Sequence, residues 1–357
     1  MKKIAILVPD LSLGGGQRSA VSTAELLAVD NSVDIVVFCD ESRVFKTDVH
    51  VIDLQCPKYS SLGGKFFNIY KRYDAFKALW LREQYDVVIS FLESANLCAY
   101  LNNRTRSVLT LHLSPTMLST FDQYILRYVF KYAANVVAVS EGLKTHLETT
   151  GYTFNDIAVI NNPINPPKIQ SMAYQSPYTH SKKFIVSAGR LTGQKRYDVM
   201  IDAFLTSKAS LTHDLVIIGG GEDFYNLKAK VKSQPNVHIV GEMKNPFPVI
   251  KAAEMFLMTS RYEAFPMVLL EALALQKVVV AYDCPTGLAD LIQHRYNGIL
   301  VENNDSSSLV KWIDKVVLNG EDVEEITSNC LPSIERYTYA SIGLRWQRYL
   351  ASREIKT

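Results

Sequence analysis

The chain has 357 residues, of which 48% are hydrophobic and 21% charged, with 38 Lys and Arg against 36 Asp and Glu. These values predict two globular domains and exclude a disordered chain, and the balanced charge argues against a dedicated nucleic-acid-binding protein. No apolar run approaches the roughly 18 residues that a membrane-spanning helix needs. The five cysteines form no Cys-x-x-Cys motif, which favours a reducing, cytoplasmic location over a disulfide framework or a zinc site.

Short apolar runs alternate with amphipathic segments along the chain. We expect buried strands at residues 3–9, 33–38, 86–90, 107–111, 135–139, 184–188, 214–219, 237–240, 255–258, 278–281 and 299–301. We expect helices at residues 16–28, 63–83, 93–101, 119–133, 141–149, 195–207, 222–233, 266–275 and 305–318. Such alternation predicts parallel sheets covered by helices, hence an α/β protein of two Rossmann-like domains facing across a cleft.

The predicted domains meet at a polar, proline-rich segment. Residues 161–167 read Asn-Asn-Pro-Ile-Asn-Pro-Pro, a composition typical of a linker. We therefore place one domain at 1–165 and a second at 166–335, and we expect a last helix within 336–357 to cross back to the first domain. Ligands in these folds bind at the carboxyl ends of the strands, so the loops that follow strands should carry the chemistry.

The first such loop contains Gly14, Gly15 and Gly16 and leads into a predicted helix. Glycines let the backbone approach a ligand, and the N–H groups at the start of a helix attract an anion. The Gly-x-Gly-x-x-Gly pattern of NAD-binding proteins is incomplete, because Ser19 stands at its last position. A flexible turn is the alternative interpretation.

The second loop, after the strand at 184–188, carries two cations. Arg190 and Lys195 are five positions apart, and Gly189 and Gly193 allow the loop to fold. Two cations fixed in this way can clamp a diphosphate, with Arg contacting two oxygens and Lys acting as a point charge. A solvated basic loop is the alternative.

The third loop contains Glu263 and leads into a helix that carries Glu271. Pro266 suits the first turn of that helix, where a missing N–H costs nothing. The helix N–H groups could bind an anion, and the carboxylates could accept hydrogen bonds from sugar hydroxyls. Ordinary loop and surface charges are the alternative.

Glu263 and Glu271 form an E-x7-E pattern, and with it the chain resembles the retaining, nucleotide-sugar-dependent glycosyltransferases of the GT-B fold, family four. Other motifs follow in the family's order along nearly the whole chain: Gly14–Gly16, Thr110–His112, Val139–Glu141, Asn162–Pro163, Gly189–Lys195, Gly219–Glu222, Gly241–Glu242 and Asn297–Gly298. Cys284–Gly287 is similar to the corresponding segment of members that build bacterial surface polysaccharides.

This resemblance implies roles for individual residues. Arg190 and Lys195 would bind the donor diphosphate, Glu263 the sugar hydroxyls and Glu271 the ribose, while His112 would reach the donor sugar from the first domain. The second domain would bind the nucleotide sugar and the first would lie on the acceptor side. Further donor-binding positions, several of them through the backbone, are Gly15, Gly16, Met243, Phe247, Phe265, Pro266, Met267 and Val268.

The resemblance also implies an activity, the transfer of a hexose from a nucleoside diphosphate sugar to a lipid-linked glycan. The expected nucleotide of the donor is UDP. We expect retention of configuration by same-face attack, because no residue stands out as a nucleophile. The sequence contains no Asp-x-Asp, so we expect no metal and no cofactor beyond the donor. The alternatives are a nucleotide-sugar epimerase of related fold and a non-catalytic nucleotide-sugar or glycan-binding module.

Residues 63–83 predict a membrane-surface helix. Aromatic residues recur at spacings of three and four, and five cationic residues against two acidic ones leave a net charge of +3. A basic, aromatic, amphipathic helix is typical of weak peripheral contact, here with the inner face of the cytoplasmic membrane, where a polyprenyl-linked acceptor would lie. The alternative is that the aromatic side chains face the core of the first domain.

Overall fold

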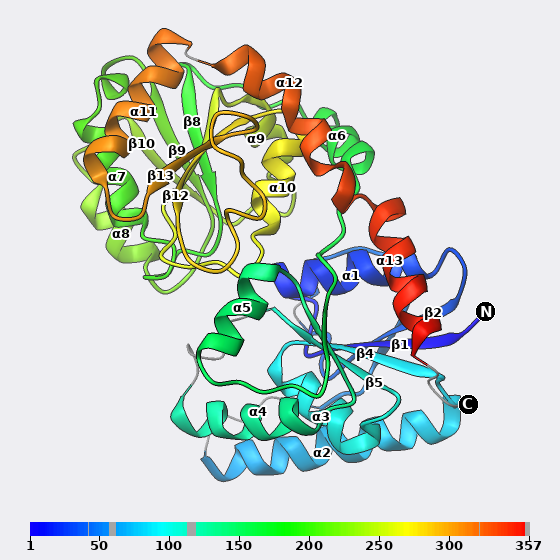
Figure 1. Ribbon diagram of the computed structural model, residues 1–357. Helices are drawn as coiled ribbons and strands as arrows, with labels where there is room; N and C mark the ends of the chain where they lie inside the picture. The colour runs from blue at the N-terminus through cyan, green and yellow to red at the C-terminus, as the bar shows by residue number, and fades with distance from the viewer. Residues whose placement is uncertain (42, 57–61, 113–118, 321, 354–357) are drawn as a thin grey trace. The chain divides into compact units, whose positions relative to one another are not determined.

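The computed structural model describes residues 1–41, 43–56, 62–112, 119–320 and 322–353, without the side chains of 62–66 and 121 (Figure 1). The chain divides into two compact units, Met1–Pro163 with Tyr339–Thr357 and Ile164–Thr338. Each unit contains one sheet in which all the paired strands are parallel, so the predicted class of two Rossmann-like α/β domains is confirmed. No helix among the described residues has both the length and the apolar character needed to cross a bilayer.

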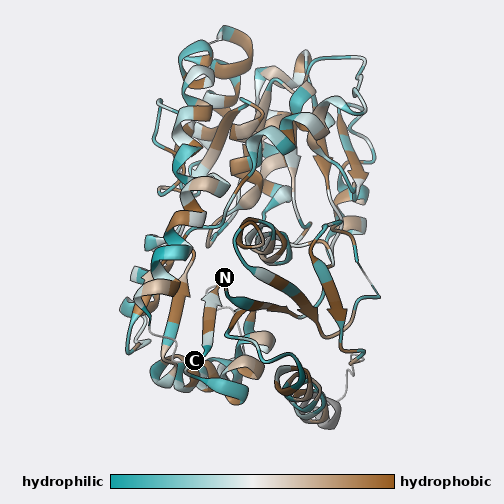
Figure 2. Ribbon diagram, turned by 90° about the vertical axis from the view of Figure 1, so that its right-hand side faces the viewer, coloured by the Kyte–Doolittle hydropathy of each residue, from teal (hydrophilic) through white to brown (hydrophobic). Residues whose placement is uncertain are grey.

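The sheet of the N-terminal unit has the strand order β3-β2-β1-β4-β5-β6-β7. The strands are β1 (Lys3–Val8), β2 (Ser32–Val37), β3 (His50–Asp53), β4 (Val87–Phe91), β5 (Ser107–Leu111), β6 (Asn135–Ala138) and β7 (Ile157–Val159). The central strands are almost continuous apolar runs because helices cover both faces of a parallel sheet (Figure 2). The edge strands β3 and β7 are short and only partly buried, which explains why the apolar pattern did not predict them.

The helices of this unit are α1 (Gly15–Leu27), α2 (Leu62–Glu83), α3 (Glu93–Asn103), α4 (Thr120–Tyr132), α5 (Glu141–Thr149) and α13 (Tyr339–Ser352). The last of these, α13, lies against α1 although more than 300 residues separate them (Figure 1). Ile342 and Trp346 are buried in the core of the N-terminal unit, and the Tyr339 hydroxyl donates to Glu25 Oε2 at 3.0 Å. The C-terminal helix is thus part of the N-terminal unit.

The sheet of the C-terminal unit has the order β10-β9-β8-β11-β12-β13. The strands are β8 (Phe184–Ala188), β9 (Asp214–Ile218), β10 (Val237–Gly241), β11 (Met255–Met258), β12 (Val278–Asp283) and β13 (Ile299–Glu302). The helices are α6 (Pro166–Tyr174), α7 (Tyr197–Thr206), α8 (Phe224–Lys230), α9 (Phe247–Ala252), α10 (Met267–Ala274), α11 (Ser306–Asn319) and α12 (Val323–Ile334).

Three local predictions were wrong. The end of the expected linker is helical, since Pro166 and Pro167 form the first turn of α6 and the Asn165 side chain accepts a hydrogen bond from the N–H of Lys168 at 3.1 Å. Gly15 lies in the first turn of α1 rather than in the preceding loop, so the helix begins one residue earlier than predicted. The helices α9 and α12 were not predicted, because α9 is only six residues long and α12 is rich in polar residues and contains a proline.

The strand order reverses once in the C-terminal sheet, between β8 and β11. In open parallel sheets this is where the two connections leave in opposite directions and where ligands bind, beyond the carboxyl ends of the strands. The loop after β8 carries Arg190 and Lys195, and the loop after β11 carries Glu263. The fold therefore brings the second and third predicted loops to one place.

Candidate active site

Several hydrogen bonds join the loop after β8 to the loop after β11. The Thr259 hydroxyl donates to the carbonyl of Lys195 at 3.1 Å, and the N–H of Arg261 donates to the carbonyl of Gln194 at 2.8 Å. The side-chain amide of Gln194 in turn donates to the carbonyl of Tyr262 at 3.0 Å. Thr259 and Gln194 are therefore positioning residues. The sequence patterns did not single them out, because their side chains bond to the backbone of the two loops and are not expected to contact a ligand.

This pairing of loops sets Lys195 against Glu263. Lys195 Nζ donates to Glu263 Oε1 in an ion pair, and the two side chains are only 18% and 8% exposed. Removing either partner would leave a largely buried charge without compensation. An ammonium group has three N–H donors, so Lys195 can keep this bond and still donate to a phosphate oxygen.

A third segment, Cys284–Gly287, packs directly on Glu263. The N–H of Glu263 donates to the carbonyl of Pro285 at 3.3 Å, and the Thr286 hydroxyl donates to the carbonyl of Glu263 at 2.7 Å. A Cβ atom on Gly287 would lie 2.5 Å from the carbonyl oxygen of Ala264, which is closer than van der Waals contact allows. The glycine of this motif is thus required for the close approach of the two backbones.

The thiol and the two tyrosine hydroxyl groups near Glu263 are uncharged at neutral pH. Burial raises the pKa of the Cys284 thiol, and the charge of Glu263 raises it further. The pKa values of the Tyr197 and Tyr262 hydroxyls are also raised, again mainly by burial and then by the charge of Glu263. Lys195 and Glu263 are therefore the charged pair in a surrounding of uncharged hydroxyl and thiol groups.

Arg190 lies on the same loop as Lys195, but its side chain is exposed. The backbone beside it is fixed, because the N–H of Leu191 donates to the carbonyl of Gly220 at 2.8 Å. A Cβ on Gly221 would lie 2.4 Å from the carbonyl oxygen of Leu191. The predicted Gly219–Gly221 motif thus serves to hold the loop that carries Arg190.

The helix α10 begins one residue later than predicted. Pro266 precedes its first turn with φ −73° and ψ 103°, so this proline caps the helix rather than forming part of it. Glu271 lies in the second turn and is 4% exposed. The side chains of Phe265 and Met267 are buried, and Val268 is partly buried. Only the backbone of this segment, with the first N–H groups of α10, is well suited to meet an anion.

The segment Met243–Phe247, which the family resemblance places at the nucleobase of the donor, leads from β10 into α9. Met243 is partly buried, whereas Phe247 is only 4% exposed. Asn245 orders the turn, since its side-chain carbonyl accepts the N–H of Phe247 at 3.2 Å and its side-chain amide donates to the carbonyl of Met172 at 2.9 Å. The burial of Phe247 makes its ring part of the core, so Met243 is the more accessible of the two side chains.

His112 and the glycine loop belong to the N-terminal unit. Gly15 has free space around its Cα, whereas a Cβ on Gly16 would lie 2.7 Å from Leu92 Cδ2. His112 follows β5, is 8% exposed and stacks on Phe91 with 4.9 Å between ring centroids. Burial lowers the pKa of His112 to about 3, so the imidazole is neutral at physiological pH.

The tautomer of His112 follows from its hydrogen bonds. The Thr110 hydroxyl donates its single hydrogen to the carbonyl of Ser90 at 2.6 Å. The same hydroxyl oxygen lies 2.9 Å from His112 Nε2 and must therefore accept a hydrogen from it. This arrangement leaves His112 Nδ1 as an acceptor, which suits a sugar hydroxyl and not an anion.

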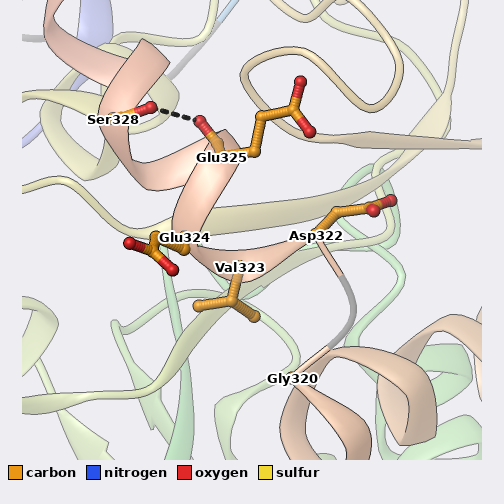
Figure 3. Close-up of a pocket in the computed structure, with 6 residues that line it drawn as sticks. All are labelled: Gly320, Asp322, Val323, Glu324, Glu325 and Ser328. Atoms are coloured by element: carbon orange, nitrogen blue, oxygen red, sulfur yellow. Dashed lines mark hydrogen bonds between the residues drawn. The ribbon is translucent and has the colours of Figure 1, made fainter.

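A separate surface pocket lies at the start of α12 and contains none of the predicted site residues (Figure 3). Its lining is acidic, and Asp322 forms an ion pair with Arg295 at 2.7 Å. The residues that line it are Gly320, Asp322, Val323, Glu324, Glu325 and Ser328. A hollow of this charge is poorly suited to an anionic diphosphate.

Comparisons with known proteins identify the family of the chain. The family described as "Glycosyltransferase Family 4" matches residues 13–168, and "Glycosyl transferases group 1" matches residues 172–330. A Campylobacter jejuni enzyme named as an alpha-1,4-N-acetyl-D-galactosaminyltransferase acting on a GalNAc-containing diNAcBac-PP-undecaprenol is 25% identical, covering 100% of this chain and 99% of that protein. The lipopolysaccharide 1,6-galactosyltransferase of Salmonella typhimurium is 25% identical over 88% of this chain and 89% of its own length.

Among solved structures, the Anabaena protein Alr3699/HepE in complex with UDP-glucose superposes with a TM-score of 0.81. It is 20% identical in sequence, and the match covers 99% of this chain and 100% of that one. At this identity the likeness establishes the fold alone, while the two family matches together span both units of the chain. The chain belongs to the family 4 glycosyltransferases of the GT-B fold.

Proposed function

We propose that this enzyme transfers a hexose from a UDP-sugar to a lipid-linked glycan during bacterial surface-polysaccharide synthesis. The observation that carries the proposal is the Lys195–Glu263 ion pair at the reversal point of the C-terminal sheet, with Arg190 exposed on the same loop. The UDP-glucose complex of a protein with the same fold supports the donor class. The undecaprenol-linked substrate named for the Campylobacter relative supports the acceptor class.

The geometry suits departure of a nucleoside diphosphate. Breaking the bond between the sugar and the diphosphate builds negative charge on the leaving oxygen and positive charge on the sugar carbon. Arg190, Lys195 and the first N–H groups of α10 would stabilise the negative charge, and stabilisation of this kind commonly contributes most of the rate enhancement. Glu263 would accept hydrogen bonds from sugar hydroxyls, Glu271 would bind the ribose, and neutral His112 would accept a hydrogen bond from the donor sugar.

The proposed transfer retains the configuration of the sugar, because the acceptor hydroxyl attacks from the face on which the diphosphate leaves. No metal ion takes part in it, because two side-chain cations and a helix terminus supply the positive charge that a metal would otherwise contribute. Proton NMR of the first-formed product reports the anomer, and turnover in the presence of EDTA reports metal independence.

We further propose weak peripheral contact of the N-terminal unit with an anionic membrane. Several aromatic side chains are exposed on α2 and α4, and α3 packs against both helices. Phe67 and Tyr70 on α2 are 49% and 64% exposed, and Tyr124 and Tyr128 on α4 are 75% and 59% exposed. Exposed aromatic rings beside lysines are typical of surfaces that rest in the headgroup region.

Some aromatic residues of α2 fit the membrane-surface interpretation, and others fit the core-facing alternative. Phe76 and Trp80 are buried in the unit, as the core-facing alternative requires. Lys71 is exposed, whereas Arg72 is partly buried and places its guanidinium 4.8 Å from the Phe38 ring centroid. Arg72 is therefore a packing residue and not one of the lipid-facing cations. The side chains of Lys65 and Phe66 lie outside the described residues.

The decisive experiment is a donor screen with UDP-, GDP- and ADP-sugars, each with and without a polyprenyl-diphosphate-linked glycan. Release of UDP that depends on the acceptor, lost in Lys195→Met, is the expected result. Conversion of a UDP-sugar to its epimer without acceptor would instead indicate an epimerase. Saturable binding of a UDP-sugar, with no turnover in the presence or absence of any acceptor tested, would indicate a binding module.

A further inference from the structure

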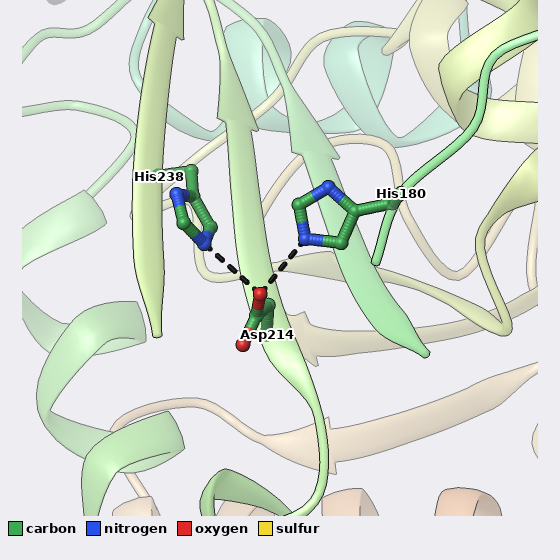
Figure 4. Close-up of side chains that lie close together, drawn as sticks. All are labelled: His180, Asp214 and His238. Atoms are coloured by element: carbon green, nitrogen blue, oxygen red, sulfur yellow. Dashed lines mark hydrogen bonds and ion pairs between the residues drawn. The ribbon is translucent and has the colours of Figure 1, made fainter. Parts of the chain in front are cut away.

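A cluster of two histidines and an aspartate lies at the amino end of the C-terminal sheet (Figure 4). Asp214 is the first residue of β9, His238 is in β10, and His180 lies in the segment that precedes β8. The loops with Lys195 and Glu263 follow the carboxyl ends of strands in this sheet. The cluster therefore lies at the opposite edge from the proposed donor site, and its role is independent of the transfer reaction.

The two imidazoles converge on one carboxylate oxygen. His180 Nε2 lies 2.8 Å and His238 Nε2 3.0 Å from Asp214 Oδ2. The sheet register explains the convergence, because His238 pairs with Val216, and Asp214 is two residues earlier on the same face of β9. One potential ligand atom from each of the three side chains lies within 4.8 Å of the other two.

The carboxylate at the centre is buried and incompletely satisfied. The Asp214 side chain is 5% exposed, and within the described residues its Oδ1 atom has no hydrogen-bond partner. The nearby cation is Lys182, whose Nζ lies 3.5 Å from that oxygen and whose side chain is 55% exposed. An exposed lysine of this kind can turn into solvent, whereas only 14% of the His180 side chain is exposed.

We propose that His180, Asp214 and His238 bind a divalent transition-metal ion, for which zinc is the appropriate probe. Two imidazoles and one carboxylate form a common ligand set for zinc, with a fourth position for water. Ligands 2.0–2.1 Å from a tetrahedral ion lie about 3.3 Å apart. The observed nitrogen–oxygen separations of 2.8 and 3.0 Å need to widen by only a few tenths of an ångström, roughly, to admit an ion.

The surroundings of His180 suit this role. Metal binding through Nε2 requires the neutral tautomer with its hydrogen on Nδ1, and the Tyr178 hydroxyl oxygen lies 3.2 Å from that atom. Such partners orient the ligating imidazole. The His180 ring also packs on Phe184, with 5.1 Å between centroids. The side chain of His238 is 37% exposed, so an ion can reach the cluster from solvent on this side.

An ion held here would join three parts of the chain: the segment before β8, the start of β9, and β10. Because these ligands come from different strands, the binding free energy would add to the stability of the folded C-terminal unit. Its expected role is structural. Chelation should lower the melting temperature and leave turnover at low temperature unchanged.

For the test, the purified full chain is stripped of metal with EDTA and titrated with zinc in competition with a chromophoric chelator. The visible spectrum of the Co²⁺ form is recorded as well. We expect one equivalent of zinc per chain and a cobalt spectrum typical of tetrahedral coordination. His180→Gln and His238→Gln each remove a proposed ligand and should weaken zinc binding by roughly 10- to 100-fold or more. Tyr178→Phe removes only the partner of a ligand and should weaken zinc binding by less. Glutamine can still donate to Asp214, so the local hydrogen bonds are kept.

The matched control is His50→Gln. His50 forms a similar pair with Asp34 at 2.9 Å, in the N-terminal unit and without a second histidine. This variant should bind zinc as the parent does. The melting temperature with and without zinc provides a second readout, which should respond to zinc in the parent and in His50→Gln but not in His238→Gln. Absence of saturable binding in the folded parent, or stoichiometric binding that survives both cluster substitutions, would overturn the proposal.

Discussion

Lys195 and Glu263 form an ion pair although 68 positions separate them in the sequence. The pair exists because β8 and β11 are neighbours in the sheet, with Ile185 opposite Met255, while β9 and β10 lie on the other side of β8. The loops that follow two adjacent parallel strands necessarily emerge at the same edge. The hydrogen bond between Gln194 and Tyr262 then helps to fix the loops closely enough for the side chains to meet.

Replacing Lys195 by Met should lower turnover at saturating donor by about 10²- to 10³-fold, the effect of losing one preorganised electrostatic contact in a transition state. It should also destabilise the C-terminal unit, because Glu263 would keep a buried charge without its partner. Arg190→Ala should reduce turnover similarly without loss of stability, since its side chain is exposed. Steady-state kinetics and thermal unfolding measure the two effects.

Lys230→Met is the control for this pair of variants. Lys230 forms an exposed ion pair with Asp202 at 2.8 Å in the same unit, so its removal should change neither quantity appreciably. Turnover of Lys195→Met close to that of the parent would remove Lys195 from the proposed diphosphate site.

Glu263→Gln should reduce kcat more than Glu271→Gln, which should mainly raise the KM for the donor. The reason is that Glu263 is proposed to contact the reacting sugar, whereas Glu271 is proposed to contact the ribose, whose interactions are similar in the ground and transition states. Initial rates over a range of donor concentrations separate the two effects. Glu324→Gln, in the acidic pocket of Figure 3, should match the parent. Equal effects on KM alone from both glutamate variants would contradict this division of roles.

Gly287→Ala should lower kcat/KM by roughly tenfold or more while the protein stays folded, because the new methyl group would displace the backbone that carries Glu263. The matched control is Gly343→Ala in α13, outside the proposed site, where a Cβ would lie 3.7 Å from Leu26 Cδ1, an ordinary van der Waals contact. The comparison requires only donor-dependent rates and circular dichroism spectra. An unchanged rate in Gly287→Ala would show that the close approach at Ala264 is not needed for activity.

The buried His112 should make the folded state less stable in mild acid. Burial lowers its pKa from 6.5 to about 3, so between these values the unfolded chain binds a proton that the folded chain does not. The free energy of unfolding therefore falls as the pH drops through this window, with a slope of up to about 1.4 kcal/mol per pH unit from this group. Above pH 6.5 the stabilising contribution of neutral His112 is fully present. Urea unfolding at about pH 7 and about pH 4.5 measures the loss.

His112→Gln should lose less stability between these two pH values than the parent. The same His112 substitution should lower turnover if the residue meets the donor sugar. A parental pH dependence of stability in His112→Gln would show that His112 is not the group responsible.

The full-length protein should sediment with anionic but not neutral vesicles, weakly and only at low salt. Lysine side chains near an anionic surface contribute about 1 kcal/mol each, and salt screens them. Replacing exposed Lys71 and Lys77 by Ser should remove the anionic preference, and Tyr124→Ser with Tyr128→Ser should weaken binding further. Co-sedimentation at two salt concentrations measures both.

Lys228→Ser with Lys232→Ser, two exposed lysines of the C-terminal unit, is the control. Lys228 lies 5.7 Å from the Phe224 ring centroid, much as Lys71 lies 4.8 Å from Phe67. If both double lysine variants lose the same fraction of binding, the attraction is a property of the overall charge and not of α2.

Apolar periodicity by itself determined the parallel α/β class and every central strand, because a strand buried on both faces is apolar at nearly every position. It missed the edge strands β3 and β7, because they are short and only partly buried, and it took Asn165, Pro166 and Pro167 for a linker although they form the N-cap and first turn of α6. Family motifs in the sequence placed Arg190, Lys195, Glu263 and Glu271 in loops and helices of the second half.

The tertiary structure decided which of these residues meet and how. Only strand order sets Lys195 beside Glu263, and only the packing of Gly287 shows why the Cys284–Gly287 segment is needed there. The neutral state of His112 likewise depends on burial, and its tautomer depends on the Thr110 hydroxyl, which already donates to the carbonyl of Ser90. Residue types and their order are properties of the sequence, but desolvation and contact between distant segments arise only when the sheet has formed.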